Sequence, residues 1–219
     1  MPGPSRNYAK ELEQLIQKLQ QEGKVPRLLL HACCTPCSSA VLEYLSQYFA
    51  ITLLYYNPNI APLEEYQKRE AELRRLVSQM KFTHPVALLP CQYDGQAFVQ
   101  AARGLEGEPE GGKRCEACFR LRLRYAAQEA ARLRFDYYTT TLSISPMKDP
   151  VRLNTIGTRL AEQYGVRYLQ SEFRKKDGYK RSLTLSSEYG LYRQDYCGCI
   201  FSKQERERQE AARRKEAEA

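Results

Sequence analysis

Tryptophan is absent from this sequence of 219 residues, and only three methionines and two histidines are present. No apolar run approaches the roughly 20 residues that a membrane-spanning helix needs. The first 24 residues are polar and amphipathic, and they lack the apolar core of a signal peptide. We therefore expect a cytoplasmic protein that has no membrane partner.

Cysteine, by contrast, is plentiful, with eight residues. Structural disulfides are rare in a reducing compartment, so these cysteines indicate metal binding or redox chemistry. The formal net charge is +8, and 16 tyrosines are interleaved with the basic residues. This pattern indicates an anionic partner, with nucleic acid first, although a basic protein without such a partner remains the alternative.

Short apolar runs alternate with helix-periodic segments along the chain. Strands are predicted at residues 28–31, 51–56, 85–89, 136–142 and 166–169. Helices are predicted at 8–22, from Ser38 or Ser39 to 48, and at 62–80, 96–103, 115–134 and 151–164. This alternation predicts an α/β protein with a Rossmann-like parallel sheet of about five strands and right-handed crossovers.

Three parts of the chain are expected to differ in role. Residues 1–24 form an N-terminal helix, residues 25–202 form the α/β catalytic domain that carries the cysteines, and residues 203–219 form a charged C-terminal tail. The middle part is long enough to bury a core without disulfides.

Seven of the eight cysteines fall into three short groups, which are Cys33, Cys34 and Cys37, then Cys115 and Cys118, then Cys197 and Cys199. Thiolates select zinc or iron–sulfur clusters. Zinc ligands are usually separated by about two to four residues, whereas two cysteines of the first group are adjacent in the sequence. We expect adjacent cysteines to point apart, as ligands to different irons of one cluster would. Structural zinc and unrelated buried thiols remain the alternatives.

The last group, Cys197-Gly-Cys199, is too tight for good tetrahedral chelation by itself. A disulfide there would close a small strained ring, and strained disulfides are the labile ones, so a redox-active dithiol is indicated. Two unconnected free cysteines are the alternative. Cys91 stands alone and is expected to be a small buried apolar residue.

Two further residues lie near predicted strand ends. Asp94 is a candidate hard ligand to iron or an acid, and a turn-capping aspartate is an equal alternative. His31 ends the first predicted strand beside the cysteines, where it either orients a thiolate, donates a proton or is a satisfied core histidine. Tyr56 and Asn57 are candidates for lining a pocket that holds a base.

A basic and aromatic run lies at residues 173–181. Arg174, Lys175 and Lys176 are candidates for neutralising phosphates, and Tyr179 offers a stacking face. A merely solvated loop is the alternative.

These motifs together resemble the QueH-type epoxyqueuosine reductases. The matching stretches are residues 28–38 (LLLHACCTPCS), 55–60 (YYNPNI), 111–118 (GGKRCEAC), 139–149 (TTTLSISPMKD), 173–179 (FRKKDGY) and 191–202 (LYRQDYCGCIFS). The resemblance covers nearly the whole predicted domain. It implies a fold like that of the PP-loop ATPases, here with cysteines where those enzymes keep a glycine-rich phosphate loop.

The resemblance implies an oxidoreductase that completes queuosine biosynthesis. Epoxyqueuosine at the tRNA wobble position is reduced to queuosine, and the epoxide oxygen leaves as water. A [4Fe-4S] cluster without cobalamin is implied, together with an external electron donor. The implied cluster ligands are Cys33, Cys34, Cys115 and Cys118, and the implied redox pair is Cys197 and Cys199.

A separate iron is also implied, and Cys37 and Asp94 are its candidate ligands. We expect that iron to act as a Lewis acid on the epoxide oxygen, while Asp94, His31 or Tyr196 donates a proton. Two rival functions remain. An iron–sulfur tRNA-thiolating enzyme should need ATP and a phosphate loop, which the sequence lacks, and a zinc-stabilised RNA-binding module should be colourless.

Overall fold

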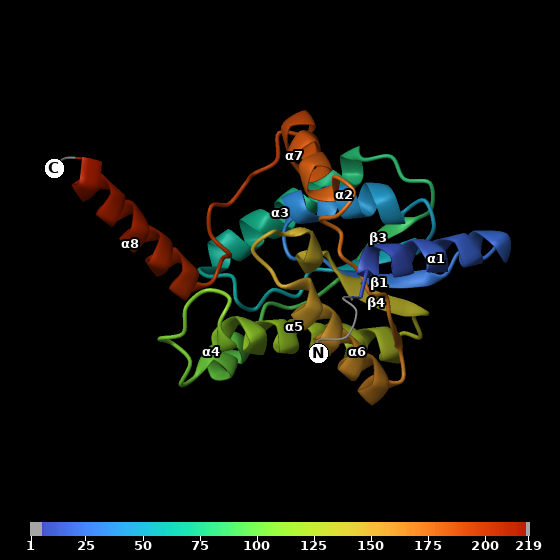
Figure 1. The fold of residues 1–219 in the computed structure, drawn as a ribbon, viewed down its shortest axis with the longest axis horizontal. Coiled ribbons are helices and arrows are strands. Elements are labelled where there is room, and N and C mark those ends of the chain that lie inside the picture. The colour runs from blue at the N-terminus through green and yellow to red at the C-terminus, as the bar shows by residue number, and fades with distance from the viewer. Residues whose placement is uncertain (1–5, 218–219) are drawn as a thin grey trace.

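A computed structural model describes residues 6–217 and contains a five-stranded sheet in which all neighbouring strands are parallel (Figure 1). The strands are β1 (Arg27–His31), β2 (Ala50–Leu54), β3 (Val86–Leu89), β4 (Tyr137–Thr140) and β5 (Arg167–Tyr168), in the order β3-β2-β1-β4-β5. The predicted α/β class and strand number are confirmed.

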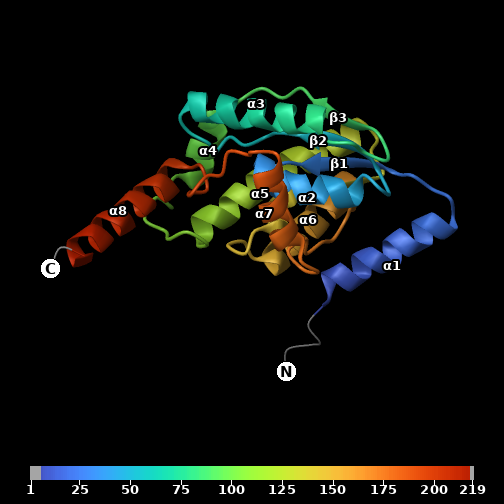
Figure 2. The same cartoon turned by 90° about the horizontal axis from the view of Figure 1, so that it is seen from above.

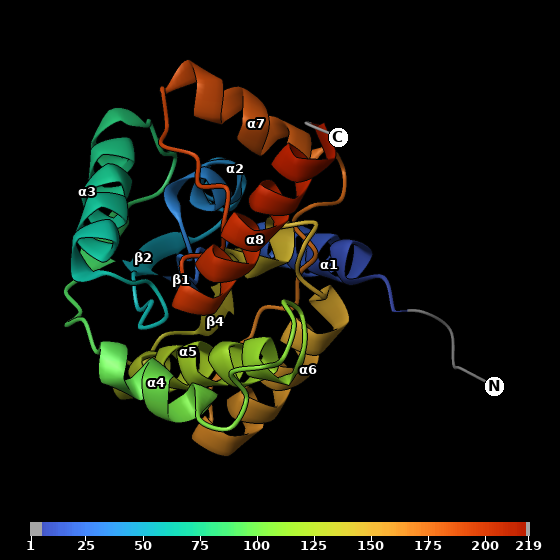
Figure 3. The ribbon, with the colours of Figure 1, turned by 90° about the vertical axis from the view of Figure 1, so that its left-hand side faces the viewer.

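Helices cover both faces of this sheet (Figures 1 and 3). One face carries α2 (Thr35–Leu45), α3 (Leu63–Gln79) and α7 (Gly178–Glu188), and the other carries α5 (Lys113–Arg132) and α6 (Pro150–Tyr164). The helix α4 (Gly95–Ala102) packs beside α5. The helix α1 (Tyr8–Gln21) adds its apolar residues to the core on the α2 side.

The sequence of β1 shows why both faces are covered. Leu28 and Leu30 belong to the core on the α2 side, whereas Leu29 belongs to the core on the α5 side. All three side chains have no exposed surface. Successive residues of a strand point to opposite faces, so a run of three leucines requires apolar layers on both sides.

The strand order places a topological switch point between β1 and β4. The chain runs from β1 outward to β2 and β3, and then returns to the other side of β1 to form β4 and β5. Loops that follow two such strands diverge, and this leaves a crevice at the carboxyl edge of the sheet. The first cysteine group follows β1 at this crevice.

The structure differs from the sequence-based predictions in four local features. The helix α2 starts at Thr35, not at Ser38 or Ser39, because Pro36 fits the first turn of a helix. Residues after β4 form a short 3₁₀ helix, η1 (Thr141–Ile144), where a continued strand and a loop were predicted. The helix α7 was not predicted at all.

The fourth difference concerns the C-terminal segment. The helix α8 (Ile200–Ala217) begins immediately after the last cysteine, three residues before the predicted tail, and projects away from the body (Figures 1 and 2). Residues 218–219 of that predicted tail, and 1–5 of the predicted N-terminal helix, lie outside the described residues. Among residues 6–217, no helix combines the length and apolar character that crossing a membrane requires.

Candidate active site at the carboxyl edge of the sheet

The first cysteine group forms a compact set of sulfurs after β1. The Sγ atoms of Cys33, Cys34 and Cys37 all lie within 4.8 Å of one another, and those of Cys33 and Cys34 are 3.9 Å apart. The expectation that the adjacent pair points apart was therefore wrong. Cys34 has an extended backbone just before α2, and the first turn of that helix carries Cys37.

Thr141, which follows β4, holds Cys33 from the neighbouring strand. The Cys33 backbone N–H donates to Thr141 Oγ1 at 3.0 Å, and that hydroxyl donates to Cys33 Sγ at 3.2 Å. Hydrogen bonds from the thiols of Cys34 and Cys37 are the main cause that holds the pKa of Cys33 well below its ordinary value, against the effect of burial. The pKa values of Cys34 and Cys37 are raised because their thiols share that proton network. The trio therefore favours one thiolate stabilised by two thiols.

The second cysteine group lies at the start of α5. The Gly111 backbone N–H donates to Cys115 Sγ at 3.2 Å, and Cys118 is one turn further along the helix. A helix N-terminus favours thiolates, as the sequence predicted. Burial nevertheless raises the pKa of Cys118 to about 12, an effect that Arg122 partly opposes.

Cys197 connects the three groups. It lines a cavity of about 260 Å³ together with the Cys33, Cys34 and Cys37 trio. It also lines a second, much smaller cavity of about 10 Å³ with Cys115, Cys118 and Cys199. Cys197 therefore borders both cavities, while among the described residues the only group of three cysteine sulfurs found within 4.8 Å of one another is that of Cys33, Cys34 and Cys37. All eight cysteines are free thiols in this structure.

The turn that carries Cys197 and Cys199 requires glycine between them. Gly198 has φ +112°, a left-handed conformation that favours glycine. A Cβ atom there would lie 2.9 Å from Arg69 Nη1 and 3.0 Å from Ile60 Cγ1. Backbone conformation and close packing therefore both select glycine at the centre of this turn.

Arg69 of α3 contacts the same turn. Its side chain is 1% exposed, its Nε donates to Glu65 Oε1 at 2.7 Å, and its Nη1 donates to the Cys197 carbonyl at 3.4 Å. The hydroxyl of Thr35, next to Cys34, donates to the Arg69 carbonyl at 3.4 Å. This arginine therefore joins the backbone of the dithiol turn to the start of α2.

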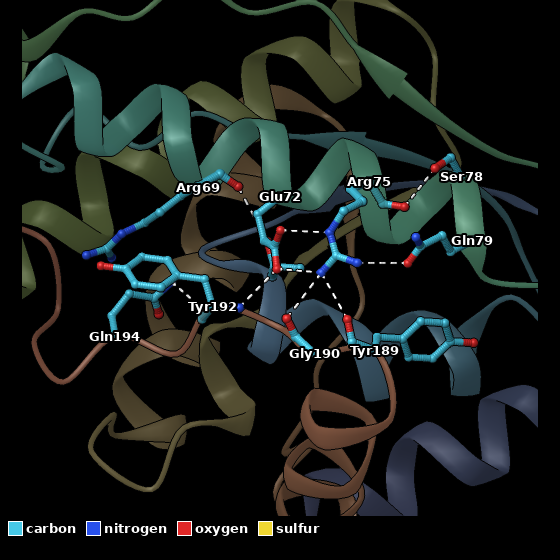
Figure 4. Close-up of polar contacts among 10 residues, drawn as sticks. Arg69, Glu72, Arg75, Ser78, Gln79, Tyr189, Gly190, Tyr192 and Gln194 are labelled. Carbon is cyan, nitrogen blue, oxygen red and sulfur yellow. Dashed lines mark hydrogen bonds and ion pairs between the residues drawn. The ribbon is translucent and has the colours of Figure 1, made fainter.

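The chain segment that leads into the dithiol turn is fastened to the same helix, α3 (Figure 4). Arg75 Nη2 donates to the Tyr189 carbonyl at 3.0 Å and pairs with Glu72 Oε1 at 2.7 Å. The same carboxylate oxygen accepts the Tyr192 backbone N–H at 2.9 Å. The Lys68 ammonium lies 3.6 Å from the centre of the Tyr192 ring. These contacts fix the path of residues 189–196.

The larger cavity has a polar wall and a partly apolar mouth. Lys148 is 8% exposed and its Nζ donates to Glu110 Oε1 at 2.8 Å. Burial lowers the pKa of Lys148, but nearby Cys197 and Glu110 outweigh it, so the ammonium stays charged. Met147 and Tyr179 line the same cavity and are 70% and 36% exposed. The lining of this cavity therefore combines buried charge with exposed apolar and aromatic side chains.

His31 is a satisfied core residue and not a substrate-binding group. It has no exposed surface, and its Nδ1 lies 2.8 Å from Thr140 Oγ1 and its Nε2 lies 3.0 Å from the Tyr56 carbonyl. The Tyr56 carbonyl only accepts, which requires a hydrogen on Nε2, whereas the Arg122 Nε, 3.4 Å from the same nitrogen, is a donor. The shorter contact favours the tautomer in which Nε2 donates to the carbonyl and Nδ1 accepts from the threonine hydroxyl. Burial, with Arg122 nearby, lowers the pKa of His31 to about 3, so the ring is neutral and a poor proton donor.

Asp94 caps a helix. Its exposed carboxylate accepts the Ala97 backbone N–H at 3.1 Å at the start of α4, and it lies outside the three-sulfur group. The structure therefore places Asp94 as a helix cap, and its roles as iron ligand and acid stay predictions. Cys91 lies 3.8 Å from the Tyr125 hydroxyl, outside both cavities.

Tyr56 and Asn57 do not line the cysteine cavity. Tyr56 is 5% exposed and stacks on Tyr125 with ring centres 3.9 Å apart. Asn57 is 1% exposed, and its amide bridges the Ala32 carbonyl at 2.8 Å and Arg122 Nη2 at 2.6 Å. Both side chains are enclosed in this structure, and their contact with a substrate stays a prediction.

The basic run before α7 is divided between two places. Tyr179 lines the cysteine cavity, whereas Lys175 and Lys176 line a groove beside α1, where Lys176 pairs with Glu13. The Arg174 Nε donates to Glu172 Oε1 at 2.9 Å. Of the four predicted phosphate-binding or stacking residues, only the tyrosine therefore lies at the cavity.

Sequence reasoning missed three buried cations, Arg69, Arg122 and Lys148. None of the three was singled out in the sequence analysis. The available signal was spacing, since Arg122 follows Cys118 by one helical turn and therefore lies on the same face of α5. No comparable spacing links Arg69 or Lys148 to a cysteine.

The fold and the site define a Rossmann-like α/β protein whose ligand crevice is lined by thiols and buried cations, a class suited to soft-metal or redox chemistry. Residues 28–205 match the family model described as epoxyqueuosine reductase QueH. The chain belongs to the QueH family.

Three relatives illustrate the similarity. Epoxyqueuosine reductase QueH of Streptococcus pyogenes serotype M1 is 40% identical over 203 residues, covering 92% of this chain and 80% of that protein. The protein of the same name from Staphylococcus epidermidis is 38% identical, with 90% and 84% covered. The one from Thermotoga maritima is 34% identical, with 84% and 94% covered.

We predict that Gly198→Ala disrupts the dithiol turn. The new methyl group meets the Arg69 guanidinium and Ile60, and a non-glycine residue strains a backbone with positive φ by about 1–3 kcal/mol. Chemical denaturation should show a loss of stability of that order. The matched control is Gly107→Ala, because open space surrounds that position. Equal stability of the two variants would contradict the packing argument.

Proposed function

We propose that this chain is an epoxyqueuosine reductase, an oxidoreductase that converts epoxyqueuosine to queuosine at the wobble position of tRNA. Membership of the QueH family supports this activity. The observation that carries the proposal is the position of Cys197, which lines one cavity with the first cysteine group and another with the second. A reductive centre and a dithiol would thus act on one substrate.

We further propose a [4Fe-4S] cluster held by Cys33, Cys34, Cys115 and Cys118. The donors are thiols, the ligands that iron–sulfur clusters select. Cys33 and Cys34 line one cavity and Cys115 and Cys118 line another that shares Cys197 with it, so a common cluster would lie between the two, beside the buried cation Arg122. When bound there, the cluster supplies electrons one at a time. Cys37 lies with the first two ligands and is the candidate that this chain offers for a separate iron.

The dithiol accounts for the electron balance of the reaction. Oxidation of the Cys197 and Cys199 thiols to a disulfide releases two electrons and two protons. The epoxide takes up both electrons and both protons, its two C–O bonds break, an alkene forms and the oxygen leaves as water. An external electron donor then returns the disulfide to two thiols, so the protein is unchanged after each turnover.

We favour Tyr196 as the proton donor over His31, which is buried and neutral, and over Asp94, which caps a helix. It lines the cavity, next to Cys197 in the chain. Burial raises the pKa of Tyr196, so the phenol keeps its proton at neutral pH and can donate it to the departing oxygen. The Lys148 ammonium in the same wall stabilises negative charge that develops on that oxygen.

The mouth of the cavity suits an unstacked nucleotide. Bases of single-stranded RNA loops stack on exposed aromatic side chains when proteins read them. Tyr179 and Met147 supply such a surface at the entrance, and the exposed Arg193 supplies charge for the RNA backbone. Lys175 and Lys176 are exposed near α1, where they would contact tRNA beyond the wobble nucleotide.

The cluster assignment predicts that Cys33→Ala and Cys118→Ala each remove iron, sulfide and brown colour from anaerobically purified protein. Mutation of a residue that hydrogen-bonds to a metal ligand typically lowers metal affinity or activity by about 10–100-fold. Loss of a ligand itself should therefore lower turnover by at least that factor. Iron and sulfide analysis and assay on epoxyqueuosine-tRNA measure both effects. Cys91→Ala is the control, since this cysteine lies outside both cavities. Bound zinc without sulfide in the unmodified protein would support the RNA-binding module instead.

The dithiol assignment makes a separate prediction. Cys197→Ser and Cys199→Ser should abolish multiple turnover while iron and sulfide content stay at the level of the unmodified protein, because neither residue is a proposed cluster ligand. Anaerobic assay with a chemical reductant, beside metal analysis of the same samples, measures this. Undiminished turnover in both serine variants would contradict the redox role.

For the cavity mouth, we predict that Tyr179→Ala weakens binding of tRNA by about 1–3 kcal/mol, the range for loss of one base–aromatic stack. Fluorescence anisotropy with labelled tRNA measures the dissociation constant. The control is Leu183→Ala, one turn further along α7, with 40% exposure but outside the cavity. Equal affinity of the two variants would exclude stacking on Tyr179.

A further inference from the structure

We propose that Arg122 is the charge-compensating residue of the metal centre, a buried cation that stabilises its reduced state. This inference rests on the proposed function, because it concerns the cluster assigned there. Arg122 lies on α5 one turn after Cys118 and is 2% exposed. None of the comparisons or motifs above gives this residue a role.

The first argument is that Arg122 has no acidic partner. Among residues 6–217, no carboxylate forms a salt bridge with its guanidinium. Its contacts are the Asn57 amide oxygen at 2.6 Å from Nη2, the neutral His31 ring at 3.4 Å from Nε, and Cys118 Sγ at 3.9 Å from Nη1. Buried charges in proteins are normally paired, because burial removes the favourable free energy of hydration and only a partner of opposite charge compensates for that loss.

The other two buried arginines have different partners, although Arg69 Nη2 and Arg114 Nε make no hydrogen bond. Arg69 is paired with Glu65 at 2.7 Å. The Arg114 guanidinium donates to the carbonyl of Glu106 at 2.8 Å and to that of Glu108. For Arg122, the nearby groups that can carry a negative charge are therefore cysteine sulfurs.

Position is the second argument. Arg122 lines the cavity that contains Cys33, Cys34 and Cys37, and the same guanidinium touches Cys118 from the second cysteine group. Arg122 therefore lies within reach of both groups of proposed ligands.

A fixed positive charge at this place has a predictable effect. One-electron reduction of a cluster adds one negative charge, and attraction to a nearby cation is strong where water is excluded. Arg122 therefore favours the reduced state and raises the reduction potential. The Asn57 contact holds the planar guanidinium in place, so orientation is maintained through both oxidation states.

The test compares three variants in the full-length protein, purified without oxygen. Arg122→Gln removes the charge but keeps a polar amide side chain. Arg122→Lys keeps the charge, and Arg124→Gln removes an exposed charge from the same helix. Iron and sulfide content is measured first. The one-electron reduction potential is then measured by redox titration with dithionite, followed by electron paramagnetic resonance.

We expect Arg122→Gln to bind the cluster and to lower its one-electron reduction constant tenfold or more, a potential more negative by at least about 59 mV. Arg122→Lys should stay close to the unmodified protein, and Arg124→Gln should match it. If Arg122→Lys kept the cluster and Arg122→Gln lost it, that result would also show that a positive charge is required at this position.

Three results would overturn the inference. One is an unchanged potential in Arg122→Gln. Another is an equal shift, or equal loss of the cluster, in Arg122→Gln and Arg122→Lys, which would assign the residue a packing role. The third, absence of iron and sulfide from the unmodified protein, would remove the proposed centre itself and is thereby distinguished from the first two.

Discussion

Parallel pairing of β1 with β4 is the constraint on which the site depends. The register sets His31 opposite Thr140, so the residues that follow, Cys33 and Thr141, emerge side by side and bond to each other. Because β2 and β3 lie on one side of this pair and β5 on the other, the crossovers diverge and leave the crevice open. The thiol-lined cavity is thus a product of strand order, which cysteine spacing alone does not dictate.

Buried charge is the second organising feature. A guanidinium inside a protein is costly unless a partner compensates it, and α3 and α5 each carry one beside the cavity. Arg69, with Glu65, is joined to the backbone of the dithiol turn, whereas Arg122 faces sulfur. The same cations that shape the cavity also set its positive potential. Stability of this region and affinity for an anionic centre are therefore linked.

Several elements were predictable because their signals are local. The leucines of β1, the cysteines at the start of α5 and the glycine between Cys197 and Cys199 all follow from residue type and spacing. The helix α7 was missed because residues 178–188 mix serine, threonine and basic residues, which hide the helical period. Asp94 was open to two interpretations because capping depends on the helix starting at Gly95, and a carboxylate before a turn has the same appearance as a ligand.

The class of fold, the family and the three cysteine groups can be inferred from the sequence alone, because hydrophobic period and motif spacing are properties of neighbouring residues. Which groups share a cavity, and which polar residues are enclosed, can be known only from the three-dimensional structure. His31, Tyr56 and Asn57 stand next to the cysteines or a strand end in sequence, yet all three are buried by contacts with residues far along the chain. Exposure and charge pairing depend on such contacts between residues far apart in the sequence, so they cannot be predicted from the spacing of neighbouring residues.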